Sequence, residues 1–273
     1  MKNLITDLKT FLILWSTQSL SQLGSSMTGF ALTLWLYQKT GSALQTALLS
    51  ICSYAPYVAT SIFAGAFSDR WNKKKIMLAC DTFAACCSVI VLFLLKAELL
   101  QPVHMYLLNA ISGLMNSVQQ PASDVAMTII IPDKYYQKAS GLKSLSNSLI
   151  TIFNPVLATA VFSLLGMEAV ISIDMTTFAI AFLALLFKVN IPSGQERDFA
   201  KKESFIETVR SGLSYLNNNR LILTLILFLA GINFVASAFD AVLPALILPK
   251  ANGGETILGI VSSCAGIATL VGS

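Results

Sequence analysis

Uncharged stretches long enough to cross a lipid bilayer recur along the whole chain. Residues 44–67, for example, contain no Asp, Glu, Lys or Arg. A helix of about 20 apolar residues spans the hydrocarbon core of a bilayer. Charged residues make up 12% of the 273 residues, about half of their share in a soluble domain. The sequence therefore predicts a protein that crosses the membrane many times.

The apolar runs define seven predicted spans and the start of an eighth. Backbone groups in lipid must find hydrogen-bond partners within their own segment, so each span is expected to be a helix. The predicted fold class is an all-α polytopic membrane protein. Its spans are expected at approximately 11–37, 44–67, 76–95, 104–131, 140–165, 169–187, 221–248 and 256–273.

The longest and most charged connection follows the sixth span. Residues 1–190 are therefore predicted to form a six-helix half, 191–219 a cytoplasmic linker, and 220–273 the start of a second half. The sequence is still apolar where it stops at Ser273, so we expect a fragment or a truncated frame. The linker is expected to hold an amphipathic surface helix, from apolar residues at helical spacing: Phe205, Val209, Leu213 and Leu216.

Lysine and arginine residues are concentrated on alternate connections. With the N-terminus placed in the cytoplasm, fifteen of the 18 lie on the inner side and three on the outer side. This bias sets the orientation of membrane proteins, so it predicts a cytoplasmic N-terminus. The net charge of +4 then has a topological origin, and no nucleic-acid partner is expected.

Polar residues at helical spacing form a stripe on four of the predicted spans. Side-chain amides are costly to leave in hydrocarbon, so these stripes are expected to face protein or a water-filled cavity. The alternative is that small and polar residues simply hold the helices together. On the first interpretation, the side chains that line a substrate cavity are Gln18, Gln22, Asn116, Gln119, Asn147 and Asn233.

Four acidic residues fall inside the predicted spans. An ionisable residue within a membrane is a functional candidate by default. Asp81 and Asp124 are placed near the cytoplasmic ends of their spans, whereas Asp174 and Asp240 are placed nearer the outer ends. None is expected to reach the middle of the membrane. The centre of the protein is therefore expected to be polar and uncharged.

The residue pattern argues against catalytic, metal and nucleotide sites. The five cysteines lie inside apolar runs without metal-site spacing and are expected to be small hydrophobic residues. His104, the single histidine, is expected at the outer membrane surface. The sequence has no GxxxxGK[ST] loop, so this chain is expected to bind no ATP. No cofactor or metal is predicted, and the chain is not expected to be an enzyme.

The stretch GAFSDRWNKKK, residues 65–75, lies between the second and third spans. It resembles the signature loop of the major facilitator superfamily, in which a Gly precedes Asp-Arg by three residues and basic residues follow. Asn72 replaces the second glycine of that loop, and Asn also tolerates a left-handed backbone. The residues that match the signature are Gly65, Asp69, Arg70, Lys73 and Lys74.

Other stretches are similar to the drug-exporting branch of this family, which includes bacterial macrolide efflux proteins. They are LWLYQKTGSALQTALL, KKKIMLACD, QQPASD and ISIDMTTF. The resemblance implies a family fold of about twelve spans, of which this chain holds the first six-helix half and the first one or two helices of the second. It also implies export of amphipathic small molecules across the bacterial plasma membrane, driven by protons.

The resemblance implies roles for individual residues. Asp69 would help lock the cytoplasmic side, and Arg70 or Lys74 would pair with Asp124. The candidate coupling acids are Asp81, Asp174 and Asp240. Two departures weaken the expectation of conventional proton antiport. The fourth span has no arginine, and Asn154-Pro155 stands where the exporter pattern favours Gly-Pro.

Three alternatives to drug export stay open at this stage. The chain could belong to a facilitator that moves a metabolite such as a siderophore. It could be a non-transporting product of a broken gene. An integral-membrane enzyme is the weakest alternative, because the sequence offers no candidate catalytic residues.

Overall fold

The computed structural model describes residues 8–191, 214–248 and 254–272. All regular elements within these residues are helices, which confirms the predicted all-α fold. Of the linker helix predicted from Phe205, Val209, Leu213 and Leu216, the first three residues lie outside the described residues, and Leu216 lies in a short helical segment, 214–218. The elements are α2 (Lys9–Thr40), α3 (Ala43–Arg70), α4 (Lys73–Lys96), α5 (Pro102–Ile130), the 3₁₀ turn η1 (Asp133–Tyr135), α6 (Tyr136–Phe187), α8 (Arg220–Ile247) and α9 (Gly254–Gly272).

Polar residues end one helix and begin the next at the short connections. Gly41 closes α2 in the left-handed region (φ 60°), and its N–H donates to the Tyr37 carbonyl. Ser42 then accepts from the Gln45 N–H and starts α3. Asn72 starts α4 in the same way by accepting from the Lys75 N–H, with φ −62°. The backbone at Asn72 is therefore extended rather than left-handed, and its side chain serves as a helix cap.

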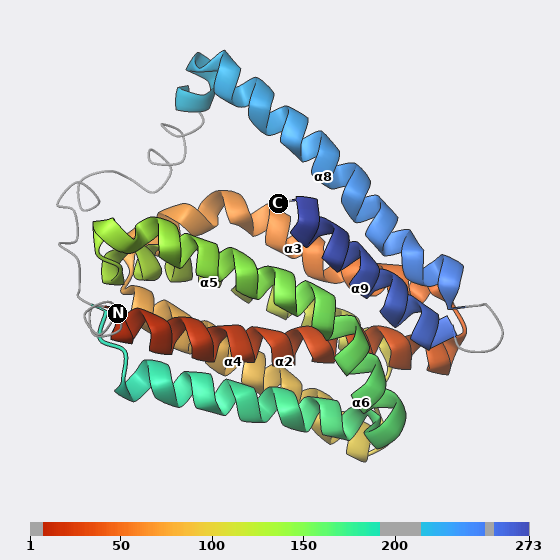
Figure 1. The fold of residues 1–273 in the computed structure, drawn as a ribbon. Helices are drawn as coiled ribbons and strands as arrows, with labels where there is room; N and C mark the ends of the chain where they lie inside the picture. The colour runs from red at the N-terminus through yellow and green to blue at the C-terminus, as the bar shows by residue number, and fades with distance from the viewer. Residues whose placement is uncertain (1–7, 192–213, 249–253, 273) are drawn as a thin grey trace.

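The long element α6 contains the fifth and sixth predicted spans. Its two parts meet at Gly166, where the backbone has φ 82° and ψ 177° and is not helical. A positive φ favours glycine, so this residue permits the sharp reversal visible in Figure 1. Lys96 and Glu168 form an exposed ion pair of 3.7 Å beside the bend.

The described helices of residues 8–191 pack as one bundle (Figure 1). Helix α2 lies along α6, α3 lies along α5, and α4 contacts both α5 and α6. Helix α9 packs on α6, where the Ser263 hydroxyl donates to the Ile152 carbonyl at 2.6 Å. Helix α8 contacts mainly α3, and its side chains from 224 to 239 are exposed.

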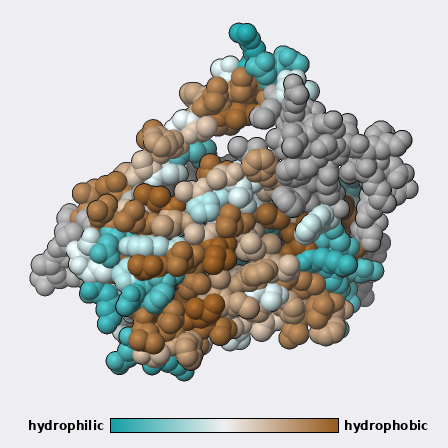
Figure 2. Space-filling model, turned by 180° about the vertical axis from the view of Figure 1, so that it is seen from behind, coloured by the Kyte–Doolittle hydropathy of each residue, from teal (hydrophilic) through white to brown (hydrophobic). Residues whose placement is uncertain are grey.

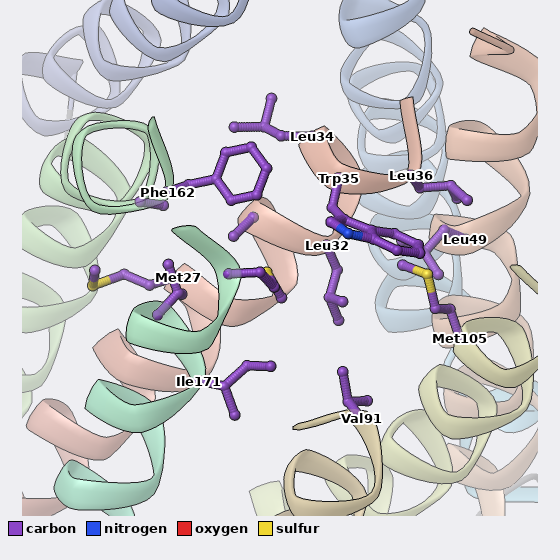
Figure 3. Packing of buried hydrophobic residues seen from close by; sticks show 14 of the residues in the cluster. Met27, Leu32, Leu34, Trp35, Leu36, Leu49, Val91, Met105, Phe162 and Ile171 are labelled. Carbon is purple, nitrogen blue, oxygen red and sulfur yellow. The ribbon is translucent and has the colours of Figure 1, made fainter. Parts of the chain in front are cut away.

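Helix α2 supplies apolar residues to all three buried clusters of the bundle. In Figure 3, Trp35 and Met27 of α2 lie among side chains of the neighbouring helices, including Met105, Phe162 and Ile171. Lipid tails are as apolar as leucine, so close van der Waals packing holds these helices together more than the hydrophobic effect does. Helix α2 provides this close packing, because it contacts its neighbours along its length.

The outer surface of the bundle is apolar. Three helical segments within the described residues are long and apolar enough to cross a membrane by length and composition: Lys73–Lys96, Asp133–Phe187 and Arg220–Pro244. Large hydrophobic side chains are exposed on α4 and α6, including Phe93 and Leu183. Figure 2 shows brown, hydrophobic atoms over the middle of one face and teal, hydrophilic atoms gathered toward its ends. This distribution matches a surface that contacts lipid.

Gly113 permits the close contact between α3 and α5, and this generates a first prediction. A Cβ atom at this position would overlap the Ser53 backbone carbonyl. Gly113→Ala should therefore destabilise the protein by about 1–3 kcal/mol through overpacking. Gly141→Ala is the matched control, because a Cβ there meets nothing within 4 Å. Chemical unfolding in detergent micelles would measure both, and a Gly113→Ala variant as stable as the control would contradict the packing.

Candidate functional site

A polar cavity lies inside the bundle, between α2, α3, α4, α5 and α6. Its volume is about 650 Å³, which falls within the range of sites that hold drug-sized ligands. Five of the six predicted cavity residues line it: Gln18, Gln22, Asn116, Gln119 and Asn147. Helical spacing on α2, α5 and α6 brings these amides together from distant parts of the sequence.

Asn233 does not line this cavity. Its side chain on α8 is exposed, and its Nδ2 donates to the Leu229 carbonyl one turn earlier. Because α8 packs against α3 and not between α2 and α5, its polar residue lies outside the bundle. The predicted position of Asn233 in the cavity wall is therefore wrong for this structure.

Asp81 of α4 reaches the cavity wall and is only 7% exposed. The Gln18 Nε2 of α2 donates to one of its carboxylate oxygens at 3.4 Å, and the Gln119 Nε2 of α5 donates to the other. Two of the predicted cavity amides therefore hold an acid, a contact that the helical stripes do not predict. The three residues connect α2, α4 and α5 through one carboxylate.

Asp174 of α6 is a second acid in the cavity wall and is 4% exposed. The Ser25 hydroxyl of α2 donates to its Oδ1 at 2.9 Å. The hydroxyls of Thr28 and Ser88 both donate to its Oδ2 at 3.1 Å. Ser88 follows Asp81 by seven residues on α4, and that spacing could have placed both on one face.

The wall of this cavity contains acidic residues in addition to the amides. Both Asp81 and Asp174 face the interior, and both are held by neutral donors. Among the described residues, the ion pairs given by the structure join Lys143 to Asp124 and Lys96 to Glu168. Neither pair involves the two buried acids. The expectation that no acid reaches the middle of the membrane stays a prediction, because a place in the cavity wall does not fix an acid's depth in the bilayer.

Asp124 also lines the cavity, and its partner is Lys143 of α6. The predicted pair between Lys74 and Asp124 is wrong. The Lys74 ammonium instead donates to the carbonyls of Leu186 and Val189, at 3.0 and 2.8 Å. The last carbonyls of a helix have no partner within the helix and carry partial negative charge. A lysine at the start of α4 therefore binds the end of α6.

The remaining signature residues are only partly described. Gly65, Asp69 and Arg70 lie in the last turns of α3, but their side chains fall outside the described residues. The same holds for the Asp240 side chain on α8. Lys73 is the first residue of α4, next to Lys74. Whether Arg70 meets Asp124 therefore stays a prediction.

A second hollow of about 590 Å³ lies beside the Gly166 bend. Its walls include Trp35, Phe162 and Glu168, and it is more open than the central cavity. It contains none of the predicted site residues. The central cavity is therefore the candidate functional site.

Residues 14–273 match the family profile described as Major Facilitator Superfamily. The chain belongs to the Major Facilitator Superfamily. The family match and the apolar helices together make it a multi-pass membrane protein. The family match confirms the prediction made from the signature-like stretch at residues 65–75.

Two relatives that are named as macrolide efflux proteins confirm the resemblance to the drug-exporting branch of the Major Facilitator Superfamily. Macrolide efflux protein A of Streptococcus pyogenes is 27% identical over 252 residues, which cover 92% of this chain and 62% of that protein. Macrolide efflux protein A of Enterococcus faecalis is 27% identical over 222 residues, covering 81% and 68%. The uncharacterized MFS-type transporter YkuC of Bacillus subtilis is 26% identical over 245 residues, covering 86% and 56%. The chain thus spans about three-fifths of the length of the curated relatives it matches.

The contact between Gln119 and Asp81 generates a second prediction. Gln119→Leu should lower the free energy of unfolding by about 1–3 kcal/mol, because a buried carboxylate loses a hydrogen-bond donor. In an Asp81→Asn background, Gln119→Leu should lower the free energy of unfolding by a smaller amount. A double-mutant cycle measured by unfolding in detergent micelles would give the difference. Gln120→Leu is the matched control, since Gln120 is an exposed residue at the cavity. Equal losses in both backgrounds would show that the two side chains do not interact.

Proposed function

We propose that the protein is a secondary transporter that exports amphipathic, macrolide-like compounds from the bacterial cytoplasm. The observation that carries the proposal is the cavity of about 650 Å³, with its amides and acids, inside a bundle of membrane-spanning helices. The names of the relatives support the substrate class. The activity proposed is transport, not catalysis.

Alternating access is the mechanism that suits this architecture. In transporters built from two helix bundles, the bundles rock about a central site and expose it to each side of the membrane in turn. Gln22, Asn116 and Asn147 lie in the cavity wall. Their amides can donate to and accept from the oxygen atoms of a substrate. The apolar remainder of an amphipathic compound would contact the hydrophobic lining.

Proton antiport is the energy source that we propose, with Asp81 as the coupling acid. Its carboxylate lies in the same cavity as the substrate amides and is held by Gln18 and Gln119. The ionised form would attract a basic amine on a substrate, whereas a proton would remove that attraction. Competition between substrate and proton for one group is what antiport requires. Asp240 remains a further candidate from the sequence.

The protein is proposed to lie in the plasma membrane with its N-terminus in the cytoplasm. The excess of Lys and Arg on one set of connections supports this orientation. The loop at residues 65–75 would then lie at the cytoplasmic surface. There Lys74 binds the end of α6, and Asp69 is proposed to lock the cytoplasmic side against the second half of the transporter.

Drug accumulation in a macrolide-sensitive bacterial host tests the proposal. Cells that express the full coding sequence should accumulate several-fold less erythromycin than cells with an empty vector. A protonophore should abolish the difference, and Asp81→Asn should abolish it without loss of the protein from the membrane. Export that survives collapse of the proton gradient would reject proton coupling. Unchanged accumulation of erythromycin and of a dye panel would favour a metabolite carrier or a non-transporting product.

The proposed role of Asp69 gives a separate prediction. Asp69→Asn should slow export strongly while membrane insertion persists, because an unmatched charge in a partly buried pair costs several kcal/mol at the upper end. Asp133→Asn is the matched control, since Asp133 is an exposed acid in η1. Export rates and membrane levels measured together would separate the two effects. Wild-type export by the Asp69→Asn variant would reject the lock.

A further inference from the structure

Asp174 stands out among the acids of the bundle because hydroxyl groups enclose it. Ser25 and Thr28 approach from α2, and Ser88 approaches from α4. Both carboxylate oxygens accept from at least one hydroxyl, at 2.9 to 3.1 Å. The side chain is 4% exposed. Among the described residues, no ion pair given by the structure supplies it with a positive charge.

The donors around Asp174 differ in chemistry from those around Asp81. Asp81 is held by amide nitrogens, which donate hydrogen bonds and do not act as ligands of a hard cation. A hydroxyl oxygen keeps two lone pairs, and its hydrogen can rotate away. Carboxylate and neutral oxygen atoms are the ligands that hard cations prefer. The three hydroxyls can therefore switch from donating to Asp174 to coordinating an ion beside it.

Charge limits which cation could bind there. Buried charges in proteins are paired or coordinate metals. A single carboxylate balances a monovalent ion, whereas a divalent ion would leave one positive charge buried. The two helices also pack closely here: a Cβ at Gly24 of α2 would overlap the Thr177 Oγ1 and lie 3.0 Å from the Asp174 Cα of α6.

We propose that Asp174, Ser25, Thr28 and Ser88 form a binding site for one Na⁺ ion. The ion neutralises the buried carboxylate and joins α2, α4 and α6 at the wall of the cavity. The site is independent of the substrate proposed above. It also separates the two acids of the cavity: Asp81 faces the substrate and the proton, and Asp174 holds a resident cation.

Thermal unfolding of the purified protein in detergent tests the site without any transport measurement. The full coding sequence is used, and NaCl is compared with choline chloride at equal ionic strength. Na⁺ should leave the Tm unchanged well below the Kd and raise it by equal increments for each tenfold rise in concentration above the Kd. KCl should raise it less, because the larger ion fits the oxygen atoms poorly. Asp174→Asn should remove the Na⁺-dependent increase.

Two further variants make the test specific. Asp81→Asn makes the same change of charge in the same cavity and should keep the full response to Na⁺. Ser88→Ala removes one oxygen ligand and should weaken Na⁺ binding by about tenfold, the lower end of the effect seen when groups that support a metal site are removed. If Asp174→Asn does not fold, Ser88→Ala and Thr28→Val carry the test.

Three results would overturn the site. The first is a Tm that is the same in NaCl and choline chloride, as expected if Asp174 holds only a proton. The second is an Asp174→Asn variant that responds to Na⁺ like the wild type. The third is an unchanged Na⁺ affinity in Ser88→Ala and Thr28→Val. If the wild-type protein exports no erythromycin but Na⁺ still raises its Tm, the proposed transport function is rejected and the Na⁺ site stands, because Na⁺ binding is measured without transport.

Discussion

The cost of unsatisfied polar groups in the membrane interior governs this structure at every level. Backbone N–H and C=O groups avoid this cost by forming helices, because no water is available in the hydrocarbon. Side-chain amides and carboxylates avoid it by forming hydrogen bonds with one another across the bundle. Gln18 and Gln119 therefore turn to Asp81, and three hydroxyls turn to Asp174. The polar cavity is the result of these pairings, and the hydrophobic atoms over the middle of the face in Figure 2 are their counterpart on the outside.

Helix α2 connects these pairings. One face carries Gln18 and Ser25 to the two acids, while Trp35 and Met27 pack against the apolar cluster of Figure 3. The helix has no acidic residue of its own. It contributes donors to acids that other helices hold, so any displacement of α2 would change the surroundings of both acids together.

Several features were predictable from particular residues. The helices follow from the apolar runs, and five of six predicted amides line the cavity because a helical stripe has only one face to present. The prediction that Asn233 lines the cavity was wrong, because a polar stripe shows which face of α8 is polar but not where α8 packs. The predicted pair of Lys74 with Asp124 was wrong, because a sequence pattern shows which groups carry charge but not which helix ends lie nearby.

The sequence by itself determined the membrane class, the helices, the family and the residue types available for a site. These follow from composition, periodicity and motif, which are local properties of the chain. Only the tertiary structure decided that Asp81 and Asp174 share one cavity and that amides hold the first and hydroxyls the second. The physical reason is that a partner depends on which helices pack together. Packing is set by the fit of whole surfaces, including the close approaches at Gly24 and Gly113.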